Sequence, residues 1–437
     1  MSPSDLQEHG PRVTRAWVLH PDIAADRARR DAAPALGEAV ALAAALPGLE
    51  LVGSEIVPLP KLRPGWLFGS GKIEDLGNRL KTAEVELVLI DGPVTPVQQR
   101  NLEREWKVKI LDRTGLILEI FADRARTREG VLQVELAALS YQRTRLVRAW
   151  THLERQRGGL GFVGGPGETQ IEADRRAIDE AIVRLKRQLS KVVRTRDLHR
   201  AARRKVPFPV VALVGYTNAG KSTLFNRLTG AEVLARDMLF ATLDPTMRSI
   251  TLPSGLKVIL SDTVGFISDL PTQLVAAFRA TLEEVLEADL ILHVRDIAHP
   301  DTESQAADVR AILTDLGVDE KTPQIELWNK ADLIEPERRE ALAAVAARRE
   351  GVRTISAWTG EGIEGLLEAI TAALDETRVR REVNLGFSDG RRRAWLYAEG
   401  VVEAECQGED GVVLTVNWTA RQEQRFRALT GEQPLRG

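Results

Sequence analysis

The chain has 437 residues, of which 43% are hydrophobic and 28% are charged, with 60 Lys or Arg against 63 Asp or Glu. This length suits two to four domains, and the composition is that of a soluble globular protein, which excludes wholesale disorder, a collagen-like chain and a disulfide scaffold. A net charge of −3 also excludes a protein that is basic overall and coats nucleic acid without specificity.

Three features of the sequence predict a cytoplasmic protein that makes no integral membrane contact. The longest apolar runs, such as residues 40–46, are far shorter than the roughly 20 residues of a membrane-spanning helix. The N-terminal MSPSDLQEHGPR lacks the apolar core of a signal peptide. Cys406 is the single cysteine, so neither an intramolecular disulfide nor a cysteine-built zinc site is expected.

From Arg15 to about Ala125, short apolar runs alternate with amphipathic stretches of helical period. This alternation predicts a small α/β domain with a largely parallel sheet over residues 1–128. Within it, GSGK at residues 69–72 suggests a phosphate-binding loop. However, Ile73 replaces the Ser or Thr that would hold magnesium, and no apolar strand leads straight into the motif. We therefore interpret GSGK as a plain turn.

Two long helical stretches follow and predict an antiparallel helical hairpin over residues 129–200. Each repeats apolar residues in steps of four and three, which places them on one face, and only Arg143 interrupts the first face. At 1.5 Å per residue the first helix would reach roughly 35 to 40 Å. The two faces consist of Leu132, Leu136, Leu139, Leu146, Trp150 and Leu153, and of Ile178, Ile182, Leu185, Leu189 and Val192.

The loop between these helices, GGLGFVGGPGETQ from Gly158, contains six glycines and a proline and cannot pack a core. It is either a flexible connector or a bare backbone that approaches another large surface, with Arg155 and Arg157 supplying phosphate contacts. The second helix is basic as well, because residues 174–205 hold 12 Lys or Arg against 4 Asp or Glu. That charge marks either a solvated helix face or a surface that contacts phosphates.

Beyond the hairpin we expect three further segments. Residues 201–209 are basic, contain proline and are interpreted as a linker. Strand and helix periods alternate again over residues 210–375, which carry the chemical motifs. The remainder, residues 376–437, is predicted to be a small charged α+β domain with no motif of its own.

A predicted strand, VVALVG, leads directly into GYTNAGKS, which satisfies the phosphate-loop pattern G-x-x-x-x-G-K-[ST] between Gly215 and Ser222. Its glycines let successive backbone N–H groups surround phosphate oxygens, and the following helix points its positive end at them. Lys221 would bridge the terminal phosphates, and the Ser222 hydroxyl would ligate Mg²⁺. The motif predicts that a nucleoside triphosphate binds here.

Two further segments are expected to respond to the γ-phosphate. The strand KVILSDTVG ends in D-x-x-G, in which Asp262 can hold magnesium through water and the Gly265 N–H can sense the γ-phosphate. Before it lies LFATLDPT, where a threonine can complete the magnesium shell only when the γ-phosphate is present. Thr242 is our first choice for that ligand and Thr246 our second, and an ordinary loop threonine is the alternative.

The base is expected to bind at NKAD, residues 329–332, which follows the apolar strand QIELW. The Asp332 carboxylate can accept hydrogen bonds from N1–H and the exocyclic amine of guanine. Adenine presents no such donor pair and would leave the carboxylate unpaired. The loop SAWTG, from Ser356, supplies backbone donors near the place where guanine O6 would lie. We therefore expect GTP to be preferred over ATP.

The order of four motifs, GYTNAGKSTLFN, LFATLDPT, DTVGFI and NKAD, resembles the GTPase core of the Obg-HflX branch. The upstream RTGLILEIFADRARTREGVLQVELA and RLVRAWTHLERQRGGLGFVGGPGETQIEADRR look like the N-terminal and helical parts of the HflX family itself. The resemblance covers the chain to about residue 375. It implies an α/β protein: a P-loop GTPase domain with a mostly parallel sheet, preceded by a small α/β domain and a long helical hairpin and followed by a small α+β domain.

Similarity to HflX implies a GTPase that uses GTP, GDP and Mg²⁺, binds the large ribosomal subunit and splits stalled 70S ribosomes. On this resemblance Ser222 and Thr242 bind Mg²⁺, and Lys221, Thr242 and Gly265 contact the γ-phosphate and the transition state. The implied nucleotide contacts are Gly215, Tyr216, Thr217, Asn218, Ala219, Gly220, Lys221, Ser222, Phe240, Ala241, Thr242, Leu243, Asp244, Asp262, Thr263, Val264, Gly265, Asn329, Lys330, Ala331, Asp332, Ser356, Ala357 and Trp358.

Phe266 follows the D-x-x-G motif at the position where Ras-like enzymes carry the glutamine that orients the attacking water. Phenylalanine can neither donate nor accept that hydrogen bond, and no general base is visible in the sequence. We therefore hypothesise that unassisted hydrolysis is slow and that ribosomal RNA or protein orders the switch and the water. The chain is expected to act as a monomer, with its hairpin tip and basic helix on ribosomal RNA and no contact with DNA.

Two other functions remain open at this stage. The first is an RNA-binding assembly factor that uses GTP as an occupancy switch on precursor ribosomal particles. The second is an ATP-driven RNA remodeller that works from the N-terminal α/β domain. The missing Ser or Thr after Lys72 argues against the second, because magnesium-dependent chemistry in that domain would need it.

Overall fold

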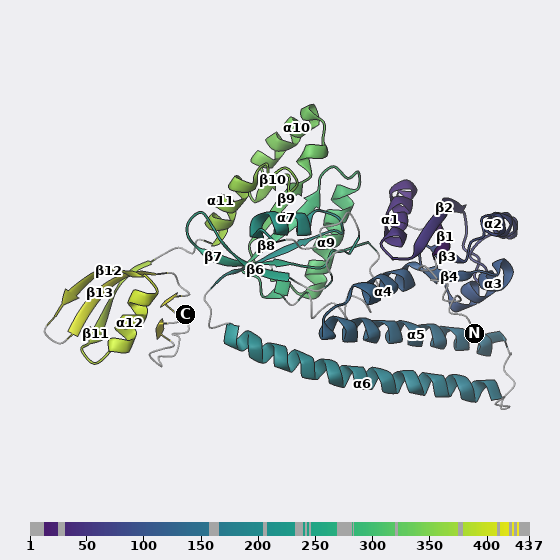
Figure 1. Cartoon of the computed structure of the whole chain (residues 1–437), viewed down its shortest axis with the longest axis horizontal. Helices are drawn as coiled ribbons and strands as arrows, with labels where there is room; N and C mark the ends of the chain where they lie inside the picture. Colours follow the sequence, from purple (N-terminus) through teal and green to yellow (C-terminus); the bar gives the residue numbers. More distant parts are fainter. Residues whose placement is uncertain are drawn as a thin grey trace, which may run out of the picture. The chain divides into compact units, whose positions relative to one another are not determined.

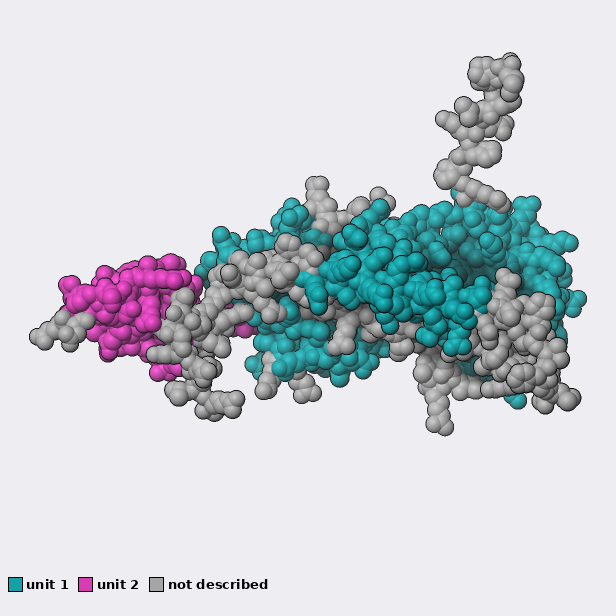
Figure 2. All heavy atoms as spheres, turned by 90° about the horizontal axis from the view of Figure 1, so that it is seen from below, with its two compact units in different colours: residues 1–367 teal, residues 368–437 magenta. Residues whose placement is uncertain are grey.

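The computed structural model describes residues 13–24, 31–156, 166–203, 208–231, 239–240, 243, 246–268, 282, 284–319, 322–374, 379–408, 411–418, 422–423 and 426–427. The chain divides into two compact units, residues 1–367 and residues 368–437 (Figure 2). Within the described part of the chain, no helix combines the length and apolarity needed to cross a membrane.

The N-terminal part of the first unit is a four-stranded sheet in the order β2-β1-β3-β4, and each neighbouring pair of strands is parallel (Figure 1). This confirms the α/β prediction. Its strands are β1 (Thr14–Ile23), β2 (Leu49–Leu59), β3 (Leu87–Ile90) and β4 (Lys109–Asp112). Its connecting helices are α1 (Ala32–Ala44), α2 (Ser70–Thr82) and α3 (Pro96–Trp106).

Both faces of this sheet are covered by helices, because successive strand residues point to opposite sides. Val18 belongs to the apolar cluster that includes residues of α1, whereas its neighbour Leu19 belongs to the cluster that includes residues of α2 and α3. The α3 helix starts with a capping box, in which Thr95 and Gln98 each bond the other's backbone N–H.

The GSGK segment is the start of a helix, so its prediction as a plain turn was wrong. Gly69 is the N-cap of α2, and Ser70 is its first helical residue. The Lys72 ammonium lies 2.5 Å from Glu55 Oε1 and 3.1 Å from Asp75 Oδ2. Because two carboxylates bind the Lys72 ammonium, this charge is not available to bind a phosphate.

Three helices follow the sheet: α4 (Arg113–Arg124), α5 (Arg128–Gln156) and α6 (Pro166–Arg203). Asp112 joins the first two of them to the end of β4. Its carboxylate caps α4 by accepting from the Gly115 N–H at 2.8 Å. It also accepts from the Tyr141 hydroxyl at 2.5 Å and from Arg145 Nη1 at 2.9 Å, both on α5. A single buried carboxylate therefore fixes the position of α5 against the sheet.

The helices α5 and α6 pack against each other as expected, with Leu132, Ile182 and Leu185 buried. Arg143, which interrupts the apolar seam, forms an ion pair with Asp179 of α6 at 2.7 Å. The start of α6 at Pro166 contradicts the expectation that the whole stretch from Gly158 to Gln170 is a loop. Its preceding residues, 157–165, lie outside the described part of the chain.

A second side of α5 is buried as well, and the four-and-three repeat does not predict it. Val134 and Ala137 are almost fully buried in the cluster that contains α4, although neither belongs to the four-and-three repeat. A helix that packs on two neighbours needs two apolar faces, and the pattern of one face does not reveal the other.

The remainder of the first unit is a six-stranded sheet in the order β10-β9-β8-β5-β7-β6. Its strands are β5 (Val210–Gly215), β6 (Thr246–Thr251), β7 (Lys257–Asp262), β8 (Leu290–Asp296), β9 (Gln324–Asn329) and β10 (Val352–Thr354). Strand β6 runs antiparallel to β7, and the other pairs are parallel, which confirms the mostly parallel prediction. Its helices are α7 (Lys221–Thr229), α9 (Thr302–Leu316), α10 (Pro336–Ala347) and α11 (Ile363–Leu374).

The second unit contains an antiparallel sheet in the order β11-β13-β12, the last part of α11 and one further helix, α12, which confirms the α+β prediction. The elements are β11 (Val379–Gly386), α12 (Gly390–Ala398), β12 (Val402–Gln407) and β13 (Gly411–Trp418). Alternate residues of β13 point inward, so Leu414 and Val416 are fully buried. Cys406 is exposed.

We predict that Asp112→Ala loosens both α4 and α5. The substitution removes a helix cap, worth about 1 kcal/mol, and leaves Tyr141 and Arg145 without their shared acceptor, at a further cost of about 2 kcal/mol. Amide hydrogen exchange in these two helices should therefore accelerate about 100-fold. Asp123→Ala, an exposed substitution on the same helix, is the control and should leave exchange unchanged. Equal exchange in the two variants would contradict the role of Asp112.

Candidate nucleotide-binding site

The phosphate loop can form only because two of its residues lack a side chain. A Cβ atom on Gly215 would overlap the Val294 carbonyl oxygen of the neighbouring strand β8. A Cβ atom on Gly220 would overlap the Asn329 side-chain amide, and Gly220 also has a φ of +94°, which disfavours other residues. The main chain between β5 and α7 is therefore held close to the ends of β8 and β9.

Lys221 is the first residue of α7, and its side chain folds back under this loop. Its Nζ donates to the carbonyl oxygens of Gly215 at 3.1 Å and Tyr216 at 2.7 Å. Burial lowers the pKa of Lys221 to about 8, although the charge of Asp262 opposes this shift. A buried ammonium at a helix N-terminus is an anion site, because both charges attract phosphate oxygens.

The residue after Lys221 faces the predicted magnesium site. The Ser222 hydroxyl donates to Asp262 Oδ2 at 2.7 Å, so the two predicted magnesium-binding groups lie side by side. Both offer hard oxygen atoms, which Mg²⁺ prefers, and Mg²⁺ needs few protein ligands because it retains water and binds phosphates. Among the described residues no group of three or more His, Cys, Asp or Glu side chains could hold a metal ion by itself. The pair therefore fits magnesium that arrives with a nucleotide.

The D-x-x-G segment lies directly against the phosphate loop. The Thr217 N–H donates to the Phe266 carbonyl oxygen at 2.7 Å, and the Phe266 N–H donates to the Gly215 carbonyl oxygen at 3.1 Å. A Cβ atom on Gly265 would lie 2.9 Å from Thr217 Cα and 3.1 Å from Lys221 Nζ. Only glycine therefore permits this approach. The Phe266 side chain is 2% exposed and turns into an apolar cluster.

Asn329 joins the two halves of the candidate site. Its side-chain amide donates to the Ala219 carbonyl oxygen at 2.8 Å, and its carbonyl oxygen accepts from the Ala357 N–H at 2.8 Å. One buried side chain thus connects the phosphate loop to the loop after β10. This use of both ends of the amide shows why an Asn is required at the end of β9.

Asp332, the predicted base-recognition residue, lies in a short 3-10 helix at Ala331–Leu333. Its Oδ1 accepts a hydrogen bond from the Ser356 hydroxyl at 2.6 Å. Lys330, with a left-handed φ of 63°, forms an ion pair with Asp296 at 2.8 Å. These contacts fix the direction of the carboxylate before any base binds, which lowers the entropic cost of recognition.

The loop at Ser356–Trp358 is supported by a residue that the sequence analysis missed. Arg227, at the end of α7, donates from Nε to the Ala357 carbonyl oxygen at 2.6 Å and from Nη2 to the Trp358 carbonyl oxygen. The Ala357 N–H is bonded to Asn329, so a guanine O6 would share that donor or take the Trp358 N–H. The Trp358 side chain is 78% exposed. No local motif identifies Arg227, because its partners are distant in sequence.

Other predicted contacts are buried within the loops that carry them, and some lie outside the described residues. Most of them are buried, whereas Asn218 is exposed and has a left-handed φ of 57°; the buried ones are Tyr216, Thr217, Ala219, Phe240, Leu243, Thr263, Val264 and Ala331. The positions of Ala241, Thr242 and Asp244 are outside the described part of the chain. The second-choice ligand, Thr246, begins β6 directly opposite Asp262.

The predicted base-binding residue narrows the class of protein. Asp332 is a carboxylate held by the Ser356 hydroxyl, and a carboxylate matches the adjacent N1–H and amine donors of guanine, a donor pair that adenine lacks. Together with a phosphate loop on a mostly parallel sheet, this defines the chain as a P-loop GTPase, which binds GTP and GDP.

Comparison with known proteins identifies the family. Family models match residues 34–122 (GTP-binding GTPase N-terminal), 124–203 (GTP-binding GTPase Middle Region), 210–330 (50S ribosome-binding GTPase) and 341–435 (HflX C-terminal domain). The GTPase HflX of Magnetococcus marinus is 51% identical over 93% of this chain and 92% of that protein. The chain therefore belongs to the HflX family of GTPases.

Other relatives extend the comparison. The GTPase HflX of Escherichia coli is 44% identical over 86% of this chain and 87% of its own length. Among solved structures, a GTP-binding protein from Sulfolobus solfataricus in complex with GDP is 23% identical, with a TM-score of 0.45. The match covers 83% of this chain and 98% of that chain.

We predict that Asp332→Asn changes base preference. An amide at this position can donate to the O2 carbonyl of xanthine and accept from its N1–H, but it repels the exocyclic amine of guanine. Affinity for GDP should fall at least 100-fold, and affinity for xanthosine diphosphate should rise, as measured by calorimetry. Asp296→Asn, which weakens the ion pair with Lys330 but leaves the Asp332 carboxylate in place, is the control and should retain guanine. An unchanged preference in Asp332→Asn would remove this residue from the base site.

We also predict that nucleotide affinity depends on the titration of Lys221. Phosphates bind the protonated ammonium, so binding takes up a proton wherever the free protein has lost it. With a pKa of about 8, GDP affinity should fall about eightfold between pH 7.5 and pH 9. Lys221→Arg remains charged in this range and corrects for deprotonation of guanine itself. A wild-type profile no steeper than that of Lys221→Arg would contradict the lowered pKa.

Proposed function

We propose that this GTPase binds the large ribosomal subunit and splits stalled 70S ribosomes, acting as a cytoplasmic monomer. The observation that carries the proposal is the combination of a guanine-nucleotide site with a long helix pair whose outer surface is basic. The match of residues 210–330 to a model described as a 50S ribosome-binding GTPase supports the choice of partner.

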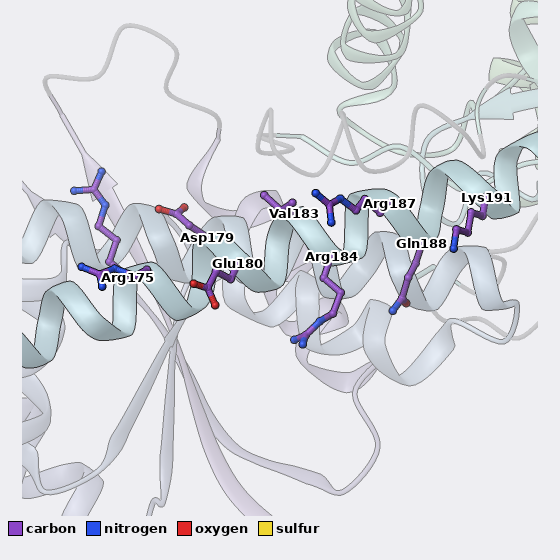
Figure 3. Close-up of a pocket in the computed structure, with 9 residues that line it drawn as sticks. Arg175, Asp179, Glu180, Val183, Arg184, Arg187, Gln188 and Lys191 are labelled. Carbon is purple, nitrogen blue, oxygen red and sulfur yellow. The ribbon is translucent and has the colours of Figure 1, made fainter.

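The basic surface lies on α6 (Figure 3). A shallow groove there is lined by Arg175, Arg176, Asp179, Glu180, Val183, Arg184, Arg187, Gln188 and Lys191. Five of these nine residues are basic, and one of the two acidic residues, Asp179, is already paired with Arg143. Exposed arginines at helical spacing suit the phosphates of folded RNA, whose shape and backbone dominate recognition. We propose that this surface and the Gly-rich segment that precedes it contact ribosomal RNA.

Within the nucleotide site we assign roles from the geometry. Lys221 and the N-terminus of α7 would bind the β- and γ-phosphates, and the Gly265 N–H would sense the γ-phosphate. Ser222 would hold Mg²⁺ together with Thr242, and Asp262 would support it. When bound, Mg²⁺ offsets negative charge that develops on the phosphates.

The position of Phe266 supports a requirement for the ribosome in rapid hydrolysis. Its buried side chain offers no polar atom to the attacking water, and its carbonyl oxygen is used by Thr217. We propose that intrinsic turnover is slow and that contact with the large subunit orders the segment around Thr242. Binding energy would then separate the subunits, and hydrolysis would release the protein.

The ATP-driven alternative in the N-terminal domain is less well supported. Lys72, which would have to reach a phosphate, is paired with Glu55 and Asp75. Breaking both pairs would cost binding energy, and the residue after Lys72 offers no hydroxyl for magnesium.

We predict that 70S ribosomes separate into subunits with the protein and GTP, and equally with a non-hydrolysable GTP analogue, but not with GDP. Sucrose-gradient sedimentation measures the separation. The 50S subunit should raise the rate of GTP turnover at least tenfold. Equal turnover with and without 50S would contradict activation by the ribosome. An effect of the protein on precursor ribosomal particles but not on mature 70S ribosomes would favour an assembly factor.

The contribution of α6 can be separated in the same assay. The double charge reversal R184E/R187E should weaken 50S binding at least tenfold at 0.1 M salt, because it removes two phosphate contacts and adds two repulsive charges. R338E/R348E makes the same charge change at exposed positions on and beside α10 and is the matched control. Deletion of residues 158–167 should abolish splitting. Equal binding of the two double variants to the 50S subunit would exclude the α6 surface as a ribosome-binding site.

A further inference from the structure

A buried polar network runs from the N-terminal α/β part of the first unit into the nucleotide site. At its centre is Tyr216, the second residue of the phosphate loop, whose hydroxyl donates to Glu38 on α1. The same hydroxyl accepts from the Ser268 N–H at 2.8 Å and lies 2.7 Å from Ser268 Oγ. Burial and the charge of Glu38 raise the pKa of Tyr216, so its hydroxyl remains a donor at working pH.

Arg113, the first residue of α4, closes the network. It donates to Glu38, to Asp91 Oδ1 at 2.6 Å and to the Ser268 carbonyl oxygen at 3.0 Å. Its side chain is 5% exposed, and the two carboxylates raise its pKa against the effect of burial. The main chain of Ser268 is therefore bonded at its N–H by the phosphate loop and at its carbonyl oxygen by α4.

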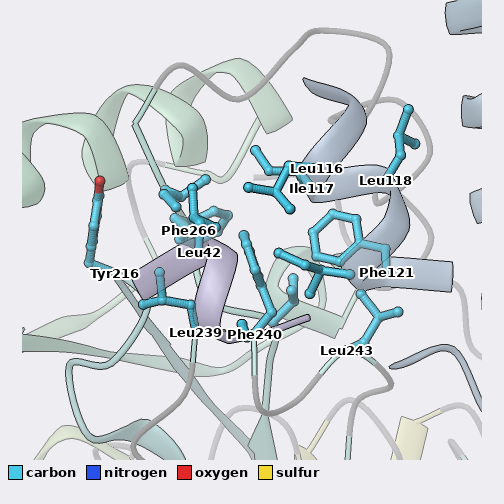
Figure 4. Packing of buried hydrophobic residues seen from close by; sticks show 14 of the residues in the cluster. Leu42, Leu116, Ile117, Leu118, Phe121, Tyr216, Leu239, Phe240, Leu243 and Phe266 are labelled. Atoms are coloured by element: carbon cyan, nitrogen blue, oxygen red, sulfur yellow. The ribbon is translucent and has the colours of Figure 1, made fainter. Parts of the chain in front are cut away.

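Apolar contacts surround this network (Figure 4). Phe266, Leu42 of α1, and Leu116 and Ile117 of α4 belong to one buried cluster. Phe121 of α4 packs edge-on against Phe240, with ring centroids 4.6 Å apart. The α1 and α4 helices thus contact both segments that the nucleotide is expected to order. A charge left buried by the loss of a partner is costly, so these groups favour one arrangement strongly.

We propose that Glu38 and Arg113 are positioning residues for γ-phosphate recognition, because they act through Tyr216 to hold Ser268 and thereby keep Gly265 against the phosphate loop. This inference rests on the role proposed above for the Gly265 N–H. It deepens that role by placing the support for Gly265 in the N-terminal domain, some 150 residues or more away in sequence.

The expected effect is a change in discrimination between nucleotides. Gly265 approaches Lys221 at the end of the loop where the terminal phosphate would lie. A loosened Ser268 lets Gly265 move away, which removes an interaction with GTP but leaves the contacts of GDP intact. By linkage, the triphosphate in turn strengthens the contact of α1 and α4 with the switch segment. An interface that only stabilised the fold would change both affinities by the same factor.

The test uses the full chain without ribosomes. Dissociation constants for GDP and for a non-hydrolysable GTP analogue are measured by fluorescence titration for wild type, Glu38→Gln and Tyr216→Phe. We expect the dissociation constant of the analogue, relative to that of GDP, to rise at least fivefold in both variants, and GDP to bind Glu38→Gln within twofold of wild type. Tyr216→Phe keeps the ring in the cluster, so it provides a folded variant even where Glu38→Gln does not fold.

Two controls sharpen the result. Glu74→Gln, an exposed substitution on α2, should leave both constants unchanged. The double variant Glu38→Gln/Tyr216→Phe should lose no more than the larger single loss, because both substitutions break one network. Equal losses for the two nucleotides, or no loss, would overturn the proposal.

The outcome for Asp332→Asn separates this inference from the proposed function. If that variant keeps its guanine preference, the nucleotide site itself has been misplaced. If it behaves as predicted while Glu38→Gln retains the wild-type ratio of affinities, only the positioning role fails. Failure of the splitting assay would leave both the nucleotide site and the positioning role standing, because the binding measurements contain no ribosomes.

Discussion

The structure depends on the close approach of the phosphate loop to its neighbours. Gly215 lies against the Val294 carbonyl oxygen, and Gly220 lies against Asn329, at distances that exclude any side chain. This approach allows Asn329 to bond both Ala219 and Ala357, which links the phosphate loop to the loop after β10. It also brings Lys221 beneath the loop. Without these contacts the motifs would be separate loops rather than one site.

The N-terminal part of the chain contributes more than a scaffold for the hairpin. Its α1 and α4 helices supply Glu38, Arg113 and Phe121 to contacts with the segments that flank the nucleotide. A GTPase sheet with this arrangement cannot change its switch conformation without disturbing buried charges and aromatic packing outside the sheet. On the positioning role proposed above, the state of the nucleotide would depend on the contacts of the N-terminal domain with these segments.

Local sequence patterns predicted the elements that form the sheets, the hairpin and the residues of the nucleotide motifs. They succeeded for the strand and helix on either side of the loop between Gly215 and Ser222 and for helices whose apolar residues repeat on one face, whereas the nucleotide contacts of that loop stay a prediction. They failed for Ser70, where a helix start resembled a turn, and for Val134, where a second helix face was buried. Glu38, Arg113, Arg227 and Ser268 could not be found, because their partners are set by tertiary packing between distant segments and leave no periodic signal.

Two consecutive residues, Asp112 and Arg113, bind different parts of the molecule. The first binds Tyr141 and Arg145 on α5, and the second binds the Ser268 carbonyl oxygen. The two residues share one peptide unit, so a displacement of α5 and a displacement of Ser268 are connected through adjacent positions of the chain. The end of α5 at Gln156 lies about 20 Å beyond the Asp112 contact at 1.5 Å per residue, so a tilt of a few degrees about that contact displaces the end by about 1 Å. We therefore expect the far end of α5 to move further than Ser268 when this helix tilts.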